Sequence, residues 1–381
     1  MAGPADRQAT GGGASRSVHI PHRLRRHAIP GTDPNIMIVG DSISHGLEGD
    51  YTWRYRLSRN FGKHGFPVRF VGPETGTSVL PASQPGDCPA RTAAPVHNGR
   101  YRPGIDFGDS RHYARWGRLL HEAKDNIRDA VAAHGADHLM VELGFNDLAW
   151  GVSGPGRLTA DLGTFVRRAR DADPNVQFLV ANVVHRTPLD SSPGLADVIT
   201  AYNEGLPSTL AAMSTARSAV VLVDLDSVYD PGSDTYDGLH PNSVGEFKIA
   251  KAFADSFSSV FGHGRIGFLD PVPRTADPLV ISPPTGIAAT SHGSSISVSW
   301  PHVFGASGYW LYWRDVTAGQ GFQRSPLPIL ADSLELPAER GHIYEFMVSG
   351  ARGHQETSVT RVAVVLDGQP ALSLAGGQGG R

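Results

Sequence analysis

Short apolar runs alternate with helical patterns along the first part of this 381-residue chain, and this alternation constrains the fold more than any other feature. Each apolar run is typical of a strand that is buried on both faces of a sheet. The runs lie at 36–40, 67–71, 138–143, 176–181 and 219–224, and the helical patterns lie near 51–63, 118–134, 157–171, 194–213 and 243–260. Strands that alternate with helices predict an α/β fold, with a parallel sheet and helices on both of its faces.

A serine follows the first apolar run at the place where an α/β enzyme commonly presents a nucleophile. The run ends at Gly40, and Asp41 and Ser42 come next. Gly40 permits a tight turn, so Ser42 would lie at the carboxyl edge of the sheet. Many apolar runs are followed by Gly-x-Ser, so this string is a weak signal until other residues are added to it.

Two distant strings contain the groups that a serine nucleophile requires. Gly-Phe-Asn-Asp at 144–147 directly follows another apolar run, and Asp-Gly-Leu-His-Pro at 237–241 lies near the end of the alternating region. A histidine can act as general base for a serine, and a carboxylate can fix the tautomer of that histidine. Taken alone, an Asp-x-x-His string more often marks the start of a helix, and Asn146 could close a turn. The combination with Ser42 favours catalysis.

These strings resemble the blocks that characterise the SGNH (GDSL-type) hydrolase family. Gly-Asp-Ser-Ile at 40–43 is similar to its first block, with Ile43 in place of the usual leucine. The strings at 144–147 and 237–241 match its Gly-x-Asn-Asp and Asp-x-x-His blocks. The resemblance covers residues 34–262 and implies a flavodoxin-like strand order for the parallel sheet.

The resemblance also implies a role for each residue of the candidate site. It implies a cofactor-independent serine hydrolase in which Ser42 is the nucleophile, His240 the base and Asp237 the partner of that base. The backbone N–H groups of Ser42 and Gly117 and the side-chain amide of Asn146 would bind the oxyanion. Gly117 could equally begin a helix and have no catalytic part.

The expected reaction is cleavage of a carboxylic ester through an acyl-enzyme on Ser42. The expected substrate is an acetyl or acyl ester of a sugar, a lipid or a small metabolite. An acyltransferase would use the same residues and remains an alternative. A non-catalytic binding protein on a hydrolase-like scaffold is a further alternative, but the joint presence of Ser42, Asn146, Asp237 and His240 argues against it.

The pattern changes after residue 262 and predicts a second, all-β domain. Residues 263–278 and their surroundings are rich in proline, which is typical of a stiff linker. Alternating runs within 279–367 predict a small sandwich that resembles a fibronectin type III domain, with Trp300 and Tyr344 in its core. This domain could bind a glycan, a protein or nothing. We expect it to be a separable unit, followed by a disordered tail at 368–381.

Composition limits the partners and the compartment. The net charge of -3 gives no basic footprint for nucleic acid, and no apolar run reaches the roughly 20 residues of a membrane span. The single cysteine, Cys88, excludes an intramolecular disulfide, and the histidines show no metal-ligand spacing, so no metal or cofactor is expected. Residues 1–33 lack an apolar core and read as a disordered lead-in. The expected location is cytoplasmic, or secreted if a signal segment was removed.

One stretch does not fit the alternation. Residues 76–113 are rich in proline, glycine, arginine and histidine and show little periodicity. So long an irregular connection is uncommon, and it is usually functional or disordered. Because it lies between the second strand and Gly117, we expect a substrate-facing lid or wall.

Overall fold

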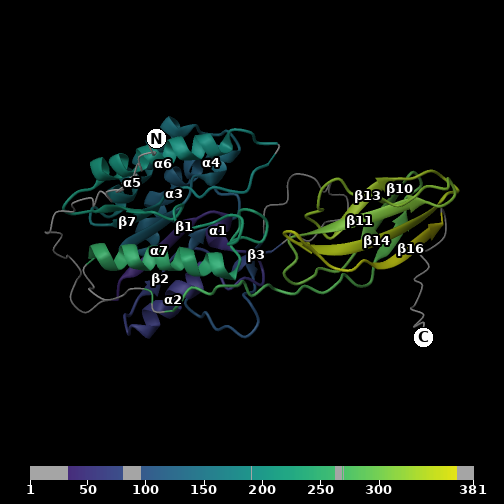
Figure 1. Cartoon of the computed structure of the whole chain (residues 1–381), viewed down its shortest axis with the longest axis horizontal. Coiled ribbons are helices and arrows are strands. Elements are labelled where there is room, and N and C mark those ends of the chain that lie inside the picture. Colours follow the sequence, from purple (N-terminus) through teal and green to yellow (C-terminus); the bar gives the residue numbers. More distant parts are fainter. Residues whose placement is uncertain (1–32, 80–95, 190, 262–267, 269, 367–381) are drawn as a thin grey trace, which may run out of the picture.

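The computed structural model describes residues 33–79, 96–189, 191–261, 268 and 270–366, which form two parts of different architecture (Figure 1). We call them the α/β domain, which contains strands β1 to β8, and the sandwich domain, which contains β9 to β16. The predictions for Cys88, for the tail and for the lead-in up to residue 32 fall outside the described residues.

Five parallel strands form the main sheet of the described α/β domain, in the order β2-β1-β6-β7-β8. Numbered among themselves along the chain, they have the order 2-1-3-4-5 of flavodoxin-like folds. This confirms the order that the family resemblance implied. A short strand that the sequence did not predict, β5 (Tyr113–Ala114), pairs with the carboxyl end of β1. The five strands are β1 (Asn35–Gly40), β2 (Arg69–Phe70), β6 (His138–Glu142), β7 (Gln177–Ala181) and β8 (Val220–Val223).

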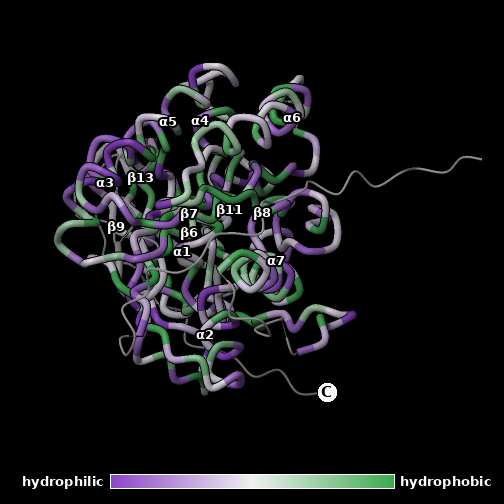
Figure 2. Tube along the Cα trace, turned by 90° about the vertical axis from the view of Figure 1, so that its left-hand side faces the viewer, coloured by the Kyte–Doolittle hydropathy of each residue, from purple (hydrophilic) through white to green (hydrophobic). Residues whose placement is uncertain are grey.

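Helices cover both faces of this sheet, as the alternation predicted. α3, α5 and α6 pack on one face, whereas α2 and α7 pack together on the other (Figure 1). Figure 2 shows the hydrophobic strands β6, β7 and β8 surrounded by more hydrophilic outer helices. No helix within the described ranges is both long and apolar enough to cross a membrane. The helices are α1 (Ser42–His45), α2 (Trp53–Lys63), α3 (Leu120–His134), α4 (Phe145–Ala149), α5 (Pro155–Ala172), α6 (Leu195–Met213) and α7 (Ser243–Phe261).

The irregular stretch at 76–113 is described in part. β3 (Thr77–Val79) pairs with β4 (Val96–Gly99), and residues 80–95 between them lie outside the described residues. Ser78 donates its N–H to the carbonyl of Gly46 at 2.9 Å and accepts the N–H of Glu48 at 2.7 Å. The hairpin therefore lies beside the turn that follows α1, and its role as a lid stays a prediction.

The sandwich domain consists of two antiparallel sheets, which confirms the all-β prediction. One sheet has the order β13-β10-β9, and the other has the order β12-β11-β14-β15 with β16 also paired to β14. Trp300 and Tyr309 pack edge to face in its core, with ring centroids 5.4 Å apart. The strands are β9 (Ala288–Ser291), β10 (Ser295–Ser299), β11 (Gly308–Asp315), β12 (Gln323–Arg324), β13 (Ser333–Pro337), β14 (Ile343–Arg352), β15 (Gln355–Glu356) and β16 (Thr360–Leu366).

Candidate active site

Ser42 is held at the carboxyl end of β1 by a tight turn. β1 ends at Gly40, and Asp41 caps the following helix by accepting the N–H of Ile43 at 3.0 Å. A Cβ on residue 40 would lie only 2.3 Å from the side chain of Ser44, so the turn requires glycine there. Ser42 is therefore the first residue of α1, at the edge of the sheet where α/β folds place their sites.

The loop before α7 brings His240 and Asp237 to this serine. His240 Nε2 lies 2.9 Å from Ser42 Oγ, and His240 Nδ1 lies 2.6 Å from Asp237 Oδ2. The other oxygen of Asp237 accepts the backbone N–H groups of Leu239 at 3.0 Å and of His240 at 2.8 Å. This pattern assigns the proton of a neutral His240 to Nδ1 and leaves Nε2 free to accept the hydroxyl of Ser42.

Asp237 is poised to remain a carboxylate. Burial favours the neutral form, but the positive charge that His240 can carry and the hydrogen bonds from that residue and from Leu239 outweigh it and lower the pKa of Asp237 to about 2. A carboxylate that is ionised at neutral pH can stabilise the positive charge that His240 gains when it accepts a proton.

Aromatic rings hold the imidazole of His240 from two residues whose role the sequence did not reveal. Trp116 is stacked on it with ring centroids 4.5 Å apart, and Tyr236 is stacked at 5.8 Å. The backbone N–H of Trp116 in turn donates to Nδ1 of the buried His45 at 3.2 Å. The ring orientation is thus fixed by packing as well as by hydrogen bonds.

Asn146 and Gly117 lie in neighbouring positions beside this group. Asn146 belongs to α4, which begins three residues after β6 ends, and its Nδ2 donates to the carbonyl of Arg118 at 3.2 Å. The same nitrogen lies 3.4 Å from Asp41 Oδ2. Gly117 lies in the chain between Trp116, whose ring is stacked on His240, and Arg118, whose carbonyl accepts the amide of Asn146, so these residues belong to the same site as Ser42. Their roles as oxyanion donors stay predictions.

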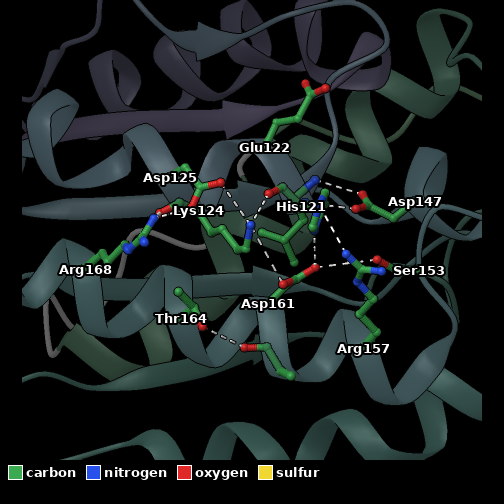
Figure 3. A network of polar contacts seen from close by, with 12 residues as sticks. His121, Glu122, Lys124, Asp125, Asp147, Ser153, Arg157, Asp161, Thr164 and Arg168 are labelled. Carbon is green, nitrogen blue, oxygen red and sulfur yellow. Dashed lines mark hydrogen bonds and ion pairs between the residues drawn. The ribbon is translucent and has the colours of Figure 1, made fainter.

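Asp147, next to Asn146 in the chain, binds the start of α3. It is fully buried and accepts the N–H groups of Leu120 at 2.8 Å and His121 at 2.9 Å, at the start of α3. Figure 3 shows Asp147 facing these backbone groups, and Asp161 of α5 facing the side chain of His121 at 2.9 Å. The network ties α3, α4 and α5 together, which is a structural role in line with the turn-forming role that its residue type favours.

A buried carboxyl pair, Asp41 and Glu142, lies next to α1, and Glu142 was missed from the sequence. Glu142 ends β6, is buried, and accepts the hydroxyl of Ser44 at 2.8 Å. Burial and the neighbouring Asp41 raise the pKa of Glu142 well above its ordinary value, and burial raises the pKa of Asp41 to about 7. The signal for this pair was a charged residue inside the apolar run 138–143.

The chain belongs to the GDSL-like lipase/acylhydrolase family, because the model of that family matches residues 36–253, more than half of the sequence. The protein is accordingly a carboxylic ester hydrolase. No curated protein is significantly similar to it.

Several solved structures resemble parts of the chain. A family 3 carbohydrate esterase from Talaromyces cellulolyticus is 23% identical, with 60% of this chain and 98% of that chain covered and a TM-score of 0.47. A family 3 carbohydrate esterase from Clostridium thermocellum is 22% identical, with coverages of 61% and 98% and a TM-score of 0.46. The fibronectin type III domain of human collagen α-1(XX) is 22% identical, with coverages of 25% and 92% and a TM-score of 0.21.

Proposed function

We propose that Ser42, His240 and Asp237 hydrolyse a carboxylic ester through an acyl-enzyme. One observation carries this proposal: the continuous hydrogen-bond chain from Ser42 Oγ to His240 Nε2 at 2.9 Å and from His240 Nδ1 to Asp237 at 2.6 Å. A serine hydroxyl is a weak nucleophile and needs an adjacent, oriented base. The chain supplies that base, and the carboxylate that orients it.

The reaction has two proton-transfer cycles. In acylation, Ser42 Oγ bonds to the ester carbonyl carbon while its proton passes to His240 Nε2. The tetrahedral intermediate then loses the alcohol, which takes that proton as the C–O bond breaks. In deacylation, water attacks the acyl group and gives a proton to His240, which returns it to Ser42 Oγ as the carboxylic acid leaves.

In this proposal three donors bind the oxyanion of the tetrahedral intermediate: the backbone N–H groups of Ser42 and Gly117, and the amide of Asn146. The position of Asn146 supports this role, because the carbonyl of Arg118 anchors its amide at 3.2 Å. Gly117 directly precedes Arg118 in the chain, so the two donors are fixed by one short segment.

The surroundings of Gly117 support a sugar ester as the substrate class. Trp150 is 60% exposed, and a Cβ on Gly117 would lie 3.3 Å from its ring. Trp116 adds a second indole next to the reacting groups. Exposed aromatic faces are recognition surfaces for ligands with an apolar side, and the C–H face of a sugar ring is such a side. We propose an acetyl or short acyl ester of a sugar.

The test compares the full-length wild type with Ser42→Ala. We expect the wild type to react with a fluorophosphonate probe and to hydrolyse p-nitrophenyl acetate and acetylated sugars faster than long-chain p-nitrophenyl esters. Ser42→Ala should lose both the labelling and the turnover and should keep its melting temperature. Near-wild-type turnover by a folded Ser42→Ala variant would contradict the acyl-enzyme, and a preference for long chains would contradict the substrate class.

A further inference from the structure

The sandwich domain contacts the α/β domain at the loops that surround Ser42 and His240. Figure 1 shows it beside the end of the α/β domain at which α1 and β3 lie. The contact contains Arg352, the last residue of β14, which is only 5% exposed. An arginine is rarely buried to this extent unless it is paired. The groups that pair with Arg352 therefore show what this contact holds in place.

Arg352 binds the turn that follows the nucleophile helix. Its Nη1 donates to the carbonyl of Glu48 at 3.0 Å, and its Nη2 donates to the carboxylate of Asp50. The second carboxylate oxygen of Asp50 accepts the N–H of Leu47 at 2.7 Å. One guanidinium thus fixes both a main-chain carbonyl and a side chain of the turn, in a fork that lysine cannot reproduce.

This turn is continuous with the residue proposed as nucleophile. The N–H of Gly46 donates to the carbonyl of Ser42 at 2.9 Å and closes α1, and the turn held by Arg352 begins at the next residue, Leu47. α1 is only four residues long, so a shift of the turn moves Ser42 with little in between to absorb it.

The β14–β15 hairpin, which contains Arg352, also reaches the loop that holds His240. His354 donates its N–H to the carbonyl of Tyr236 at 3.1 Å, and Tyr236 donates its own N–H to the carbonyl of His240 at 3.0 Å. The approach is close, because a Cβ on Gly353 would lie 2.0 Å from the carbonyl oxygen of Tyr236. Gly353 also has a φ of +56°, which favours glycine. The guanidinium carbon of Arg352 lies 5.2 Å from the centre of the Tyr236 ring.

The contact around Arg352 contains several buried acidic groups beside a cavity. A cavity of about 210 Å³ lies beside the contact and is lined by Asp50, Tyr236, Glu246 and Arg352, among others. Burial and the charge of Asp50 raise the pKa of Glu246 to about 8, and burial raises that of Asp50 against the opposing charge of Arg352. Arg352 pairs with Asp50 in this buried acidic region, and Arg56 pairs with Glu246 at 3.6 Å.

We propose that Arg352 is a positioning residue for ester hydrolysis, through which the sandwich domain holds the Ser42 turn and the His240 loop in register. The inference rests on the proposed function, because it assumes that Ser42 and His240 react together. It differs from the expectation, based on the proline-rich linker, that the second domain is a separable unit. The first domain's reacting groups would then depend on a residue of the second.

The test measures kcat, KM, the rate of fluorophosphonate labelling and the melting temperature of full-length variants with a small acetyl ester. We expect Arg352→Met to lower kcat and the labelling rate by about 10-fold to 100-fold with little change in KM, because small misplacements of reacting groups are costly. Arg352→Lys should recover only part of the loss. Arg324→Met is the matched control, since Arg324 pairs with Glu356 within the sandwich domain, and it should keep wild-type kcat.

A double variant separates positioning from stability. The single variant Arg352→Met leaves the charge of Asp50 unpaired. Arg352→Met/Asp50→Asn removes that charge, so its melting temperature should recover relative to the single variant while kcat stays low. Gly353→Ala, which keeps the ion pair but displaces the hairpin from Tyr236, should also lower kcat and serves if Arg352→Met does not fold. A kcat within twofold of wild type in the folded variants, or one that recovers with the melting temperature, would overturn the inference alone. A wild type that neither labels nor hydrolyses esters would overturn the proposed function and this inference with it.

Discussion

Two acidic groups lie beside the pair formed by Ser42 and His240, and their pKa values are shifted in opposite directions. Asp237, behind His240, has a pKa lowered to about 2, whereas Asp41, behind Ser42, has a pKa raised to about 7. Burial by itself favours the neutral form, and it is more complete for Asp41, which is 1% exposed, than for Asp237, whose side chain is 29% exposed. Asp237 faces an imidazole and backbone N–H donors, while Asp41 faces the second carboxyl of Glu142. At Asp237 the imidazole and the N–H donors outweigh partial burial, whereas at Asp41 complete burial outweighs the neighbouring groups that lower its pKa.

This difference matches two different tasks. The carboxylate of Asp237 lies where a positive charge forms during the reaction, so its ionised state is useful. Glu142, at the end of β6, has a pKa that burial and the neighbouring Asp41 raise well above its ordinary value, and it accepts the hydroxyl of Ser44. We interpret the protonated Glu142 as a neutral clamp that holds the turn of Ser42.

The largest effect on kcat is expected when Asp237, the charged one of the two acids, is neutralised. Asp237→Asn should lower kcat by about 10³-fold to 10⁴-fold, because an amide in this place would donate to Nδ1 and leave the proton of His240 on Nε2, the wrong nitrogen. Steady-state kinetics with an acetyl ester measure this effect. The melting temperature shows whether the variant is folded.

A second histidine–aspartate pair in the same domain provides the control for Asp237→Asn. His185 Nδ1 lies 2.9 Å from Asp226, but its Nε2 faces Thr200 of α6 at 3.2 Å and not Ser42. Asp226→Asn should therefore change stability and leave kcat close to that of the wild type. Equal losses of kcat in the two variants would contradict the role of Asp237 as the carboxylate that orients His240.

A smaller effect is expected at Asn146, whose amide lies next to the neutral site. Asn146→Ala should lower kcat by about 100-fold to 1000-fold, the usual result of losing one oxyanion donor. KM should change little, because the lost bond is made mainly to the tetrahedral intermediate. Kinetics and melting temperature measured on the same sample test this expectation.

Asn182 is the matched control for Asn146, because it directly follows β7 and its side chain accepts the N–H groups of Leu225 and Asp226 at 2.7 and 2.9 Å. Asn182→Ala should lower the melting temperature with kcat nearly intact. If Asn146→Ala behaves in the same way, Asn146 is a turn residue and has no part in oxyanion binding.

Much of the fold was predictable because the apolar runs and helical patterns report burial along the chain. The expected strands at 36–40 and 138–143 and the long helices appear at nearly the expected places. The sequence did not reveal β5, because two residues carry no periodicity. The candidate site was predictable as far as its motifs reach, which includes Ser42 and His240.

The missed residues share a physical cause: their partners are distant in sequence and their own patterns are ordinary. Trp116 and Tyr236 are aromatic residues in loops, and only the folded chain stacks them on His240. Glu142 interrupts an apolar run, but the run does not indicate which residue Glu142 contacts. Arg352 is 302 positions from Asp50, and nothing local to either residue indicates their contact.

The smallest effect on catalysis is expected at the neutral site. Glu142→Gln should change kcat at neutral pH by less than about threefold, or less than about 0.7 kcal/mol in activation free energy, because glutamine can donate the hydrogen bond that a protonated Glu142 donates. Stability should respond instead. The raised pKa of Glu142 means that the folded wild type holds its proton more tightly than the unfolded chain does.

That excess affinity for a proton stabilises the wild type at low pH and is lost as the pH rises from about 4, the value of an unfolded glutamate, toward the folded pKa. Glutamine does not titrate, so Glu142→Gln should gain in melting temperature relative to the wild type between about pH 4 and pH 8. Glu122→Gln, at an exposed position of α3, should show no such gain. A Glu142→Gln variant that becomes relatively less stable as the pH rises would mean that Glu142 is ionised in the folded protein. The contrast with Asp237 would then fail, because both sites would hold their charge.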